Sequence, residues 1–120
     1  MRILLADDEP DIQLLVSMAL EESGHEIVTA NDGREALEKV RAGPFDLIIL
    51  DAMMPVMGGI EAFGQLAASP STARIPVIFM TARPEDAALS DALVRGARGY
   101  IRKPFDVDTL CSDIEACLKS

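Results

Sequence analysis

Short apolar runs alternate along this chain with longer segments in which apolar residues recur every three or four positions. The apolar runs predict five strands, at residues 3–6, 26–30, 46–50, 76–80 and 99–102. The run at 46–50 is continuously apolar after its first residue, which indicates a strand buried on both faces of a sheet. Regular alternation of strands and amphipathic helices is typical of βα units. We therefore expect an α/β domain with a parallel sheet.

Five helices are predicted between and after these strands. They are expected to begin at or next to Pro10, Asn31 or Asp32, Gly59, Pro84 and Asp106, in chain order. Proline suits the first turn of a helix, and Asn or Asp suits the capping position. The first helix is expected to bury Ile12, Leu15, Val16, Ala19 and Leu20, and the last helix Val107, Leu110, Cys111, Ile114 and Leu118. Each of these apolar faces can cover one side of the sheet.

Length, charge and cysteine content narrow the class of protein. A chain of 120 residues fits one domain, and its net charge of -9 offers no basic stripe for direct nucleic-acid binding. No apolar run approaches the ~20 residues that a membrane-spanning helix needs. Cys111 and Cys117 are predicted to be thiols outside any disulfide, in a reducing compartment. With no signal peptide before the first strand, we expect a cytoplasmic protein without membrane contact.

Polar side chains follow four of the predicted strands at the point where each strand ends. They are Asp7 and Asp8 after the first strand, Asp51 after the third, Thr81 after the fourth and Lys103 after the fifth. The carboxyl ends of parallel strands meet at one edge of a sheet, so these groups are expected to converge. Each close pair of carboxylates costs about 4 kcal/mol at ~4 Å and an effective dielectric constant of ~20. A bound divalent cation removes that cost, and oxygen ligands favour Mg²⁺ or Mn²⁺.

The same group of side chains suits phosphoryl chemistry. Lys103 supplies a positive point charge and Thr81 a hydroxyl donor beside the acids. Carboxylates, a magnesium ion, an ammonium and a hydroxyl together are typical of sites that handle phosphoryl groups. A carboxylate can itself act as the nucleophile and form an aspartyl phosphate.

In this combination the chain resembles the response-regulator receiver domain, the phospho-acceptor module of two-component signalling. Four fragments carry the resemblance: Asp7-Asp8, the segment 51–59 that begins Asp-Ala-Met-Met-Pro, Thr81-Ala82, and the segment 99–105 that contains Lys-Pro-Phe. They occur in order at the ends of predicted strands, and the resemblance covers essentially residues 1–120 as one receiver domain. It implies a flavodoxin-like, doubly wound, five-stranded parallel sheet, (βα)5, of strand order 2-1-3-4-5.

The resemblance also implies a role for individual residues. Asp51 accepts the phosphoryl group, and Asp8 and Asp51 bind Mg²⁺ (or Mn²⁺) directly. Met53 binds the ion through its backbone carbonyl and Asp7 through a water molecule. Asp8 could instead cap the first helix, and that alternative stays open here.

Further roles concern the phosphoryl group and the response to it. By resemblance, Lys103 and the Thr81 hydroxyl bind phosphoryl oxygens, and small Ala82 leaves room for the group. Pro104 corresponds to a cis-proline of the family. Tyr100 corresponds to the switch aromatic, which turns inward when Thr81 is drawn to the phosphate, although it could also be an ordinary half-buried strand residue.

Two positions are unusual beside the site. Met53 and Arg83 stand two residues after Asp51 and Thr81, where relatives often have small, amide or acidic groups. Both positions flank the path of an attacking water molecule. A methionine and an arginine there predict slow loss of the phosphoryl group.

The implied function is a signalling switch that catalyses its own phosphorylation and dephosphorylation rather than a conventional enzyme. Its expected partners are a sensor histidine kinase or histidine phosphotransfer protein, and a downstream effector protein or C-terminal output domain. The responding surface is the face made by the fourth helix, fifth strand and fifth helix. The sequence leaves open whether the chain is free-standing or part of a longer regulator.

Three other functions fit the sequence less well. A phosphatase of the haloacid-dehalogenase type needs an acid two residues after its aspartate nucleophile, where this chain has Met53. A flavodoxin-like electron carrier would bind a flavin phosphate after the first strand, where Asp7, Asp8 and Glu9 would repel it. A non-phosphorylated adaptor with the same fold would not need an intact acceptor site.

Overall fold

The computed structural model describes residues 1–119 and contains one five-stranded parallel sheet of order β2-β1-β3-β4-β5. The strands are β1 (Arg2–Ala6), β2 (Glu26–Ala30), β3 (Leu47–Asp51), β4 (Val77–Thr81) and β5 (Gly99–Arg102). The helices are α1 (Pro10–Glu22), α2 (Gly33–Ala42), α3 (Gly59–Ala68), α4 (Ala87–Val94) and α5 (Leu110–Lys119). The predicted fold class, strand number and strand order are confirmed.

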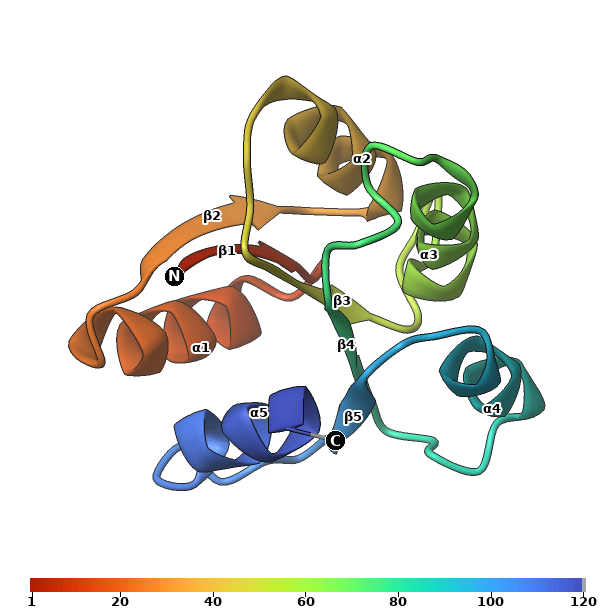
Figure 1. Ribbon diagram of the computed structural model, residues 1–120. Coiled ribbons are helices and arrows are strands. Elements are labelled where there is room, and N and C mark those ends of the chain that lie inside the picture. The colour runs from red at the N-terminus through yellow and green to blue at the C-terminus, as the bar shows by residue number, and fades with distance from the viewer. Residues whose placement is uncertain (120) are drawn as a thin grey trace.

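The helices form two layers, one on each face of the sheet (Figure 1). One core packs α2, α3 and α4 against the strand residues that include Leu4, Ile48 and Phe79. The other core packs α1 and α5 against the alternate strand residues, which include Ile49 and Ile78. Every residue of β3 and β4 is buried, as expected for central strands covered on both faces.

The start of α4 differs from the prediction. We expected this helix to begin near Pro84, but it begins at Ala87. The Asp86 side chain accepts a hydrogen bond of 2.8 Å from the backbone N–H of Ala88 and so caps the helix. Pro84 lies in the turn before the cap. A capping carboxylate fixed the boundary more strongly than the proline did.

The start of α5 and two expected core residues were also predicted wrongly. Asp106 accepts a hydrogen bond of 2.9 Å from the N–H of Asp108 and caps the turn that precedes α5, not the helix itself. Val107 lies in that turn and is 40 % exposed. Leu15 on α1 is 45 % exposed, and the buried positions of this helix are Val16 and Leu20.

At α2, the sequence left two capping residues open. The Asp32 side chain accepts a hydrogen bond from the N–H of Glu35, so Asp32 is the cap.

Two further observations bear on the class of protein. None of the helices within residues 1–119 is both long enough and apolar enough to cross a membrane. Within residues 1–119, Cys111 and Cys117 form no disulfide, as predicted.

Candidate functional site

The register of the sheet brings the polar strand ends to one edge. Ala6 of β1 is level with Leu50 of β3, and Asp51 is level with Met80 of β4. Thr81 is level with Arg102 of β5. Asp7, Asp51, Thr81 and Lys103 therefore come together at the carboxyl edge of four neighbouring strands, as the sequence predicted.

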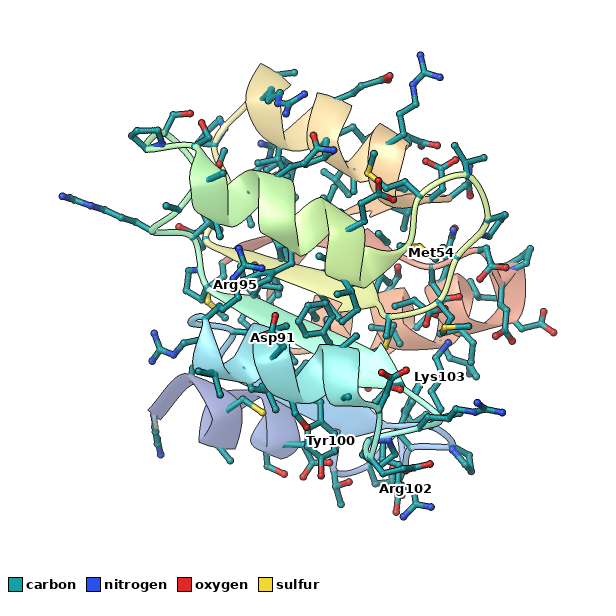
Figure 2. The ribbon with its side chains drawn as sticks, turned by 90° about the vertical axis from the view of Figure 1, so that its right-hand side faces the viewer. Met54, Asp91, Arg95, Tyr100, Arg102 and Lys103 are labelled. Carbon is teal, nitrogen blue, oxygen red and sulfur yellow. The ribbon has the colours of Figure 1, made fainter. Side chains whose placement is uncertain are left out.

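Lys103 is the centre of this group. Its Nζ donates hydrogen bonds of 2.9 Å to Oδ2 of Asp7 and 3.0 Å to Oδ2 of Asp51. A third carboxylate, that of Glu9, lies 3.6 Å from the same Nζ. Figure 2 shows Lys103 on the same side of the molecule as the β3–α3 loop, which carries Met54. The peptide bond between Lys103 and Pro104 is cis, as the resemblance implied.

Four carboxylates gather at this edge of the sheet. Oxygen atoms of Asp7, Asp8, Glu9 and Asp51 all lie within 4.8 Å of one another. Asp7 is fully buried and Asp51 is 5 % exposed, whereas Asp8 and Glu9 face the solvent. This set of oxygen donors, buried on one side and open on the other, fits Mg²⁺ or Mn²⁺ and contains none of the nitrogen or sulfur ligands that favour zinc.

Sequence reasoning did not include Glu9 among the ligand candidates. Its position directly after Asp7-Asp8 was the available signal. Glu9 is also the N-cap residue of α1, although its side chain makes no capping hydrogen bond. Asp8 therefore does not cap α1, and the structural alternative for this residue is wrong.

The electrostatics of the Asp51 carboxylate reflect its burial. Desolvation by burial raises the pKa of Asp51 above its ordinary value, the hydrogen bond from Lys103 opposes this, and the charge of Asp7 adds to the rise. Burial alone would lower the pKa of Lys103. Its hydrogen bonds to Asp7 and Asp51 outweigh that effect, so the pKa of Lys103 is raised. The lysine therefore stays charged and neutralises part of the acidic group.

A cavity of about 330 Å³ opens beside the Asp51 carboxylate. Its lining residues are Glu9, Asp51, Met53, Thr81, Ala82, Arg83 and Lys103. The backbone N–H of Met53 donates to Oδ1 of Asp51 at 3.2 Å, and the N–H of Arg83 donates to the Thr81 hydroxyl at 2.9 Å. The Met53 side chain is 70 % exposed at the mouth. The structure thus brings together the residues predicted from β3, β4 and β5 around one opening.

The loop after β3 is held close to the end of that strand. A Cβ atom at Gly59 would lie 2.2 Å from the backbone oxygen of Asp51, so only glycine fits there. Val56 in the same loop has a φ of 66°, a left-handed conformation that a β-branched residue rarely adopts. This tight loop lets α3 begin eight residues after Asp51, at Gly59.

Tyr100 lies away from the acidic group. It is 41 % exposed on β5 and lines a separate hollow of about 360 Å³ between β5 and α5, together with Arg102, Phe105 and Asp113. Figure 2 shows Tyr100 and Arg102 below α4, in the part of the molecule that contains β5 and α5. The outward position of Tyr100 leaves it free to change its exposure.

An acidic pocket with a bridging lysine thus lies at the carboxyl edge of a flavodoxin-like sheet of order 2-1-3-4-5. The chain belongs to the response regulator receiver domain family, whose sequence model matches residues 3–115. This assignment confirms the resemblance and favours it over the haloacid-dehalogenase alternative.

Individual relatives agree with the family assignment. The chain is 33 % identical to protein PilH of Pseudomonas aeruginosa, over 98 % of this chain and 97 % of that protein. It is 37 % identical to the alkaline phosphatase synthesis transcriptional regulatory protein PhoP of Bacillus subtilis, over 98 % of this chain and 48 % of that protein. The chain thus spans about half the length of several curated relatives that it matches.

Solved structures agree as well. The chemotaxis response regulator CheY4 of Vibrio cholerae superposes with a TM-score of 0.88 at 35 % identity, covering 97 % of each chain. The receiver domain of the sensor histidine kinase PA1611 from Pseudomonas aeruginosa superposes with a TM-score of 0.86 at 27 % identity, covering 99 % of this chain and 98 % of that one. That structure has a magnesium ion coordinated in its active-site cleft.

Proposed function

We propose that this chain is a phosphorylation-controlled signalling switch that takes a phosphoryl group from a phosphohistidine onto Asp51 in a Mg²⁺-dependent reaction. The donor is a sensor histidine kinase or a histidine phosphotransfer protein. One observation carries the proposal. The buried Asp51 carboxylate meets Lys103 at 3.0 Å beside an open cavity and three further acids.

The transfer step follows from the chemistry of the two groups. A carboxylate oxygen of Asp51 attacks the phosphorus atom, and a new P–O bond forms as the P–N bond of the phosphohistidine breaks. The electron pair of that bond stays on the imidazole. The other ring nitrogen already carries a proton, so the donor leaves as neutral imidazole. The product is an acyl phosphate on Asp51.

The acidic residues would hold the metal ion. We assign Asp8, Asp51 and the backbone carbonyl of Met53 as direct ligands, with Asp7 acting through a water molecule. When bound, Mg²⁺ supplies positive charge that offsets the repulsion between the carboxylates and the incoming phosphoryl oxygens. Asp7 is fully buried and bonded to Lys103, which suits a supporting role behind the exposed Asp8.

Lys103 and Thr81 would receive the phosphoryl oxygens. Lys103 already contacts the acceptor carboxylate, so its ammonium needs only a short shift to meet an oxygen on Asp51. Thr81 lines the same cavity, and its hydroxyl can donate as well as accept a hydrogen bond. Ala82 at the wall of the cavity leaves space for the group.

The response would pass from Thr81 to Tyr100. Drawing the Thr81 hydroxyl toward the phosphoryl group moves the loop after β4 and opens space for Tyr100 to turn inward. The face of α4, β5 and α5 then changes shape for an effector protein or an output domain. Relatives with a longer chain are transcriptional regulators, which supports an output of this kind.

The lifetime of the signal would depend on Met53 and Arg83. Both line the cavity at its open side, where water must approach the acyl phosphate in line with the bond that breaks. A methionine excludes water from one side. An arginine supplies no base to activate it. We therefore propose that this domain keeps its phosphoryl group for a long time compared with relatives that have small, amide or acidic groups at these positions.

Acetyl phosphate with Mg²⁺ tests the acceptor assignment. The wild-type chain should gain one phosphoryl group, located at Asp51 by mass spectrometry, and Asp51→Asn should gain none. Asp11→Asn, an exposed acid on α1, is the matched control and should behave as the wild type does. A phosphoryl group on a serine, a threonine or His25, or undiminished uptake by Asp51→Asn, would overturn the proposal.

A further inference from the structure

Gln13 in the first turns of α1 joins two backbone carbonyl groups and one side chain near the acids. Its Nε2 lies 2.5 Å from the backbone oxygen of Asp7, 3.3 Å from that of Ala30 and 2.9 Å from Oδ1 of Asn31. Two of these partners are carbonyl oxygens, which only accept hydrogen bonds. The atom that meets them must therefore be the amide nitrogen of Gln13.

With this contact, all four polar atoms of Asp7 are bonded. Its N–H donates to the backbone oxygen of Ala30 at 3.0 Å, and its Oδ1 accepts from the N–H of Glu9 at 2.8 Å. Its Oδ2 accepts from Lys103, and its backbone oxygen accepts from Gln13. The chain leaving β1 is thus fixed at every hydrogen-bonding group of this buried residue. Gln13 is the partner that comes from the helix layer.

Asp8 is held in a different way. Within residues 1–119, its exposed carboxylate has no hydrogen-bond or ion-pair partner. Its direction therefore depends on the backbone from which it projects, and that backbone begins at the carbonyl group bonded by Gln13. A metal-binding side chain without hydrogen-bond partners of its own depends most on a rigid backbone for its orientation.

We propose that Gln13 is a positioning residue that holds the Asp7-Asp8 backbone in the arrangement needed to bind a divalent cation. The inference rests on the proposed function, because it concerns the same acidic site. Gln13 touches neither the metal ion nor the phosphoryl group. It restricts the motion of Asp7 and Asp8 before the ion binds, so that less conformational entropy is lost on binding.

The support continues into α2. Asn31 Nδ2 donates to Oε2 of Glu35 at 3.2 Å, and the other carboxylate oxygen of Glu35 lies 3.1 Å from Nζ of Lys39. Asn31 is therefore held by α2 on one side and by Gln13 on the other. Removing the Asn31 side chain takes away one of the three acceptors of Gln13 and leaves the two carbonyl contacts in place.

Calorimetric titration with Mg²⁺ on the full chain tests the inference. Gln13→Met keeps the shape of the side chain and removes its donors, and it should weaken Mg²⁺ binding by about tenfold. Asn31→Ala should weaken binding in the same direction but less. Gln65→Met, the same substitution at an exposed glutamine on α3, should bind as the wild type does.

A second variant separates positioning from general stability. The buried Thr72 hydroxyl donates to the backbone oxygen of Leu66 at 2.7 Å, in the loop before β4. Thr72→Val removes this hydrogen bond and should lower the melting temperature without changing Mg²⁺ affinity. In metal-free NMR spectra, Gln13→Met should shift the amide signals of Asp8 and Glu9, and Thr72→Val should not.

The outcomes separate this inference from the proposed function. If the wild type binds Mg²⁺ and Gln13→Met binds it equally well, the positioning role is wrong and the metal site stands. If Thr72→Val weakens binding as much as Gln13→Met does, the effect is general and the positioning role is wrong. If the wild type binds no Mg²⁺, the proposed metal site fails, and the inference fails with it.

Discussion

Lys103 Nζ donates a hydrogen bond of 3.0 Å to Oδ2 of Asp51, across a separation of 52 positions in the chain. The same ammonium group bonds Asp7 at 2.9 Å. One cation thus neutralises parts of two buried carboxylates while two more acids stand beside them. Burying two acids against a single lysine costs folding free energy, and binding of a divalent cation would recover it. The predictions for Asp51→Asn and Lys103→Met follow from this balance.

Asp51→Asn should stabilise the metal-free protein. The raised pKa of Asp51, caused first by burial, means that its ionised form costs the folded state free energy. Removing that charge should raise the melting temperature by about 4 °C for each ~1 kcal/mol gained. Thermal unfolding in the presence of a chelator, with Asp11→Asn as the control, measures this.

The pH dependence of that gain has a definite sign. The folded-state pKa of Asp51 lies above the ordinary value of 3.8, so the unfolded chain releases its proton first as the pH rises. The cost is absent below the unfolded pKa and fully present above the folded pKa. The advantage of Asp51→Asn should therefore grow as the pH rises above the ordinary value of 3.8. A constant advantage as the pH rises would exclude the electrostatic cause.

Lys103→Met should have the opposite effect on the metal-free protein. The Lys103 side chain is only 14 % exposed, and its loss leaves two buried carboxylates without their partner. Breaking such a pair costs about 3–5 kcal/mol. Mg²⁺ should then raise the melting temperature more in Lys103→Met than in the wild type, because the site is more negative. Lys119→Met, at an exposed lysine on α5, should respond to Mg²⁺ as the wild type does.

The strands and the acceptor edge could be predicted because consecutive apolar residues and strand-end acids are local signals. The run before Asp51 shows burial on both faces, and parallel strands leave no choice about which ends meet. Helix starts were harder to predict. At α4, Pro84 and Asp86 are both plausible starting signals, and only the hydrogen bond to Ala88 decides between them.

Glu9 and Gln13 were missed for a different reason. Glu9 directly follows Asp7-Asp8, but whether it joins the acidic group depends on where the first turn of α1 lies relative to the end of β1. The role of Gln13 depends on contacts with the ends of both β1 and β2, which no local pattern determines. Val107 was expected to be buried because it fits a helical stripe, but the turn capped by Asp106 precedes the helix and turns Val107 toward the solvent. Contacts between elements decide such positions, and periodicity within one element does not.

Val56→Gly should stabilise the protein. Val56 has a φ of 66° and is 77 % exposed, so its side chain adds strain and little packing. The left-handed conformation costs a residue with a Cβ atom about 1–2 kcal/mol, and glycine avoids this cost. Glycine loses more conformational entropy on folding than valine does, which offsets part of this gain. Urea unfolding should therefore show a free energy of unfolding that is higher by up to ~1 kcal/mol. Val56→Ala keeps the Cβ atom, and an equal gain in that variant would contradict the explanation.

The double variant Met53→Asn/Arg83→Glu should lose its phosphoryl group several-fold faster than the wild type. Both residues line the open side of the cavity, and the replacements supply groups that can orient a water molecule. The rate is measured after removal of excess acetyl phosphate. Met18→Asn/Arg74→Glu, at two exposed positions outside the cavity, is the control. An unchanged rate in the first double variant would show that Met53 and Arg83 do not protect the phosphoryl group from water, although the acceptor assignment would survive.

Tyr100 should become less exposed when Asp51 is phosphorylated. The chain has one tyrosine and no tryptophan, so tyrosine fluorescence reports Tyr100 alone. Because Tyr100 is 41 % exposed, acrylamide should quench its fluorescence readily before phosphorylation and less afterwards. Asp51→Asn should show no change. Thr81→Ala should take up the phosphoryl group but leave the quenching unaltered, because the hydroxyl that pulls the loop is missing.

The size of the change can also be predicted. A shift from almost fully inactive to almost fully active needs about 5.5 kcal/mol of differential interaction. One new charge-assisted hydrogen bond, from Thr81 to the phosphoryl group, supplies about 1.5–3 kcal/mol. Phosphorylation alone should therefore bury Tyr100 in only part of the molecules, and a partner bound to the face of α4, β5 and α5 should complete the change. Quenching that falls to its limiting value without a partner would show that other contacts also drive the switch.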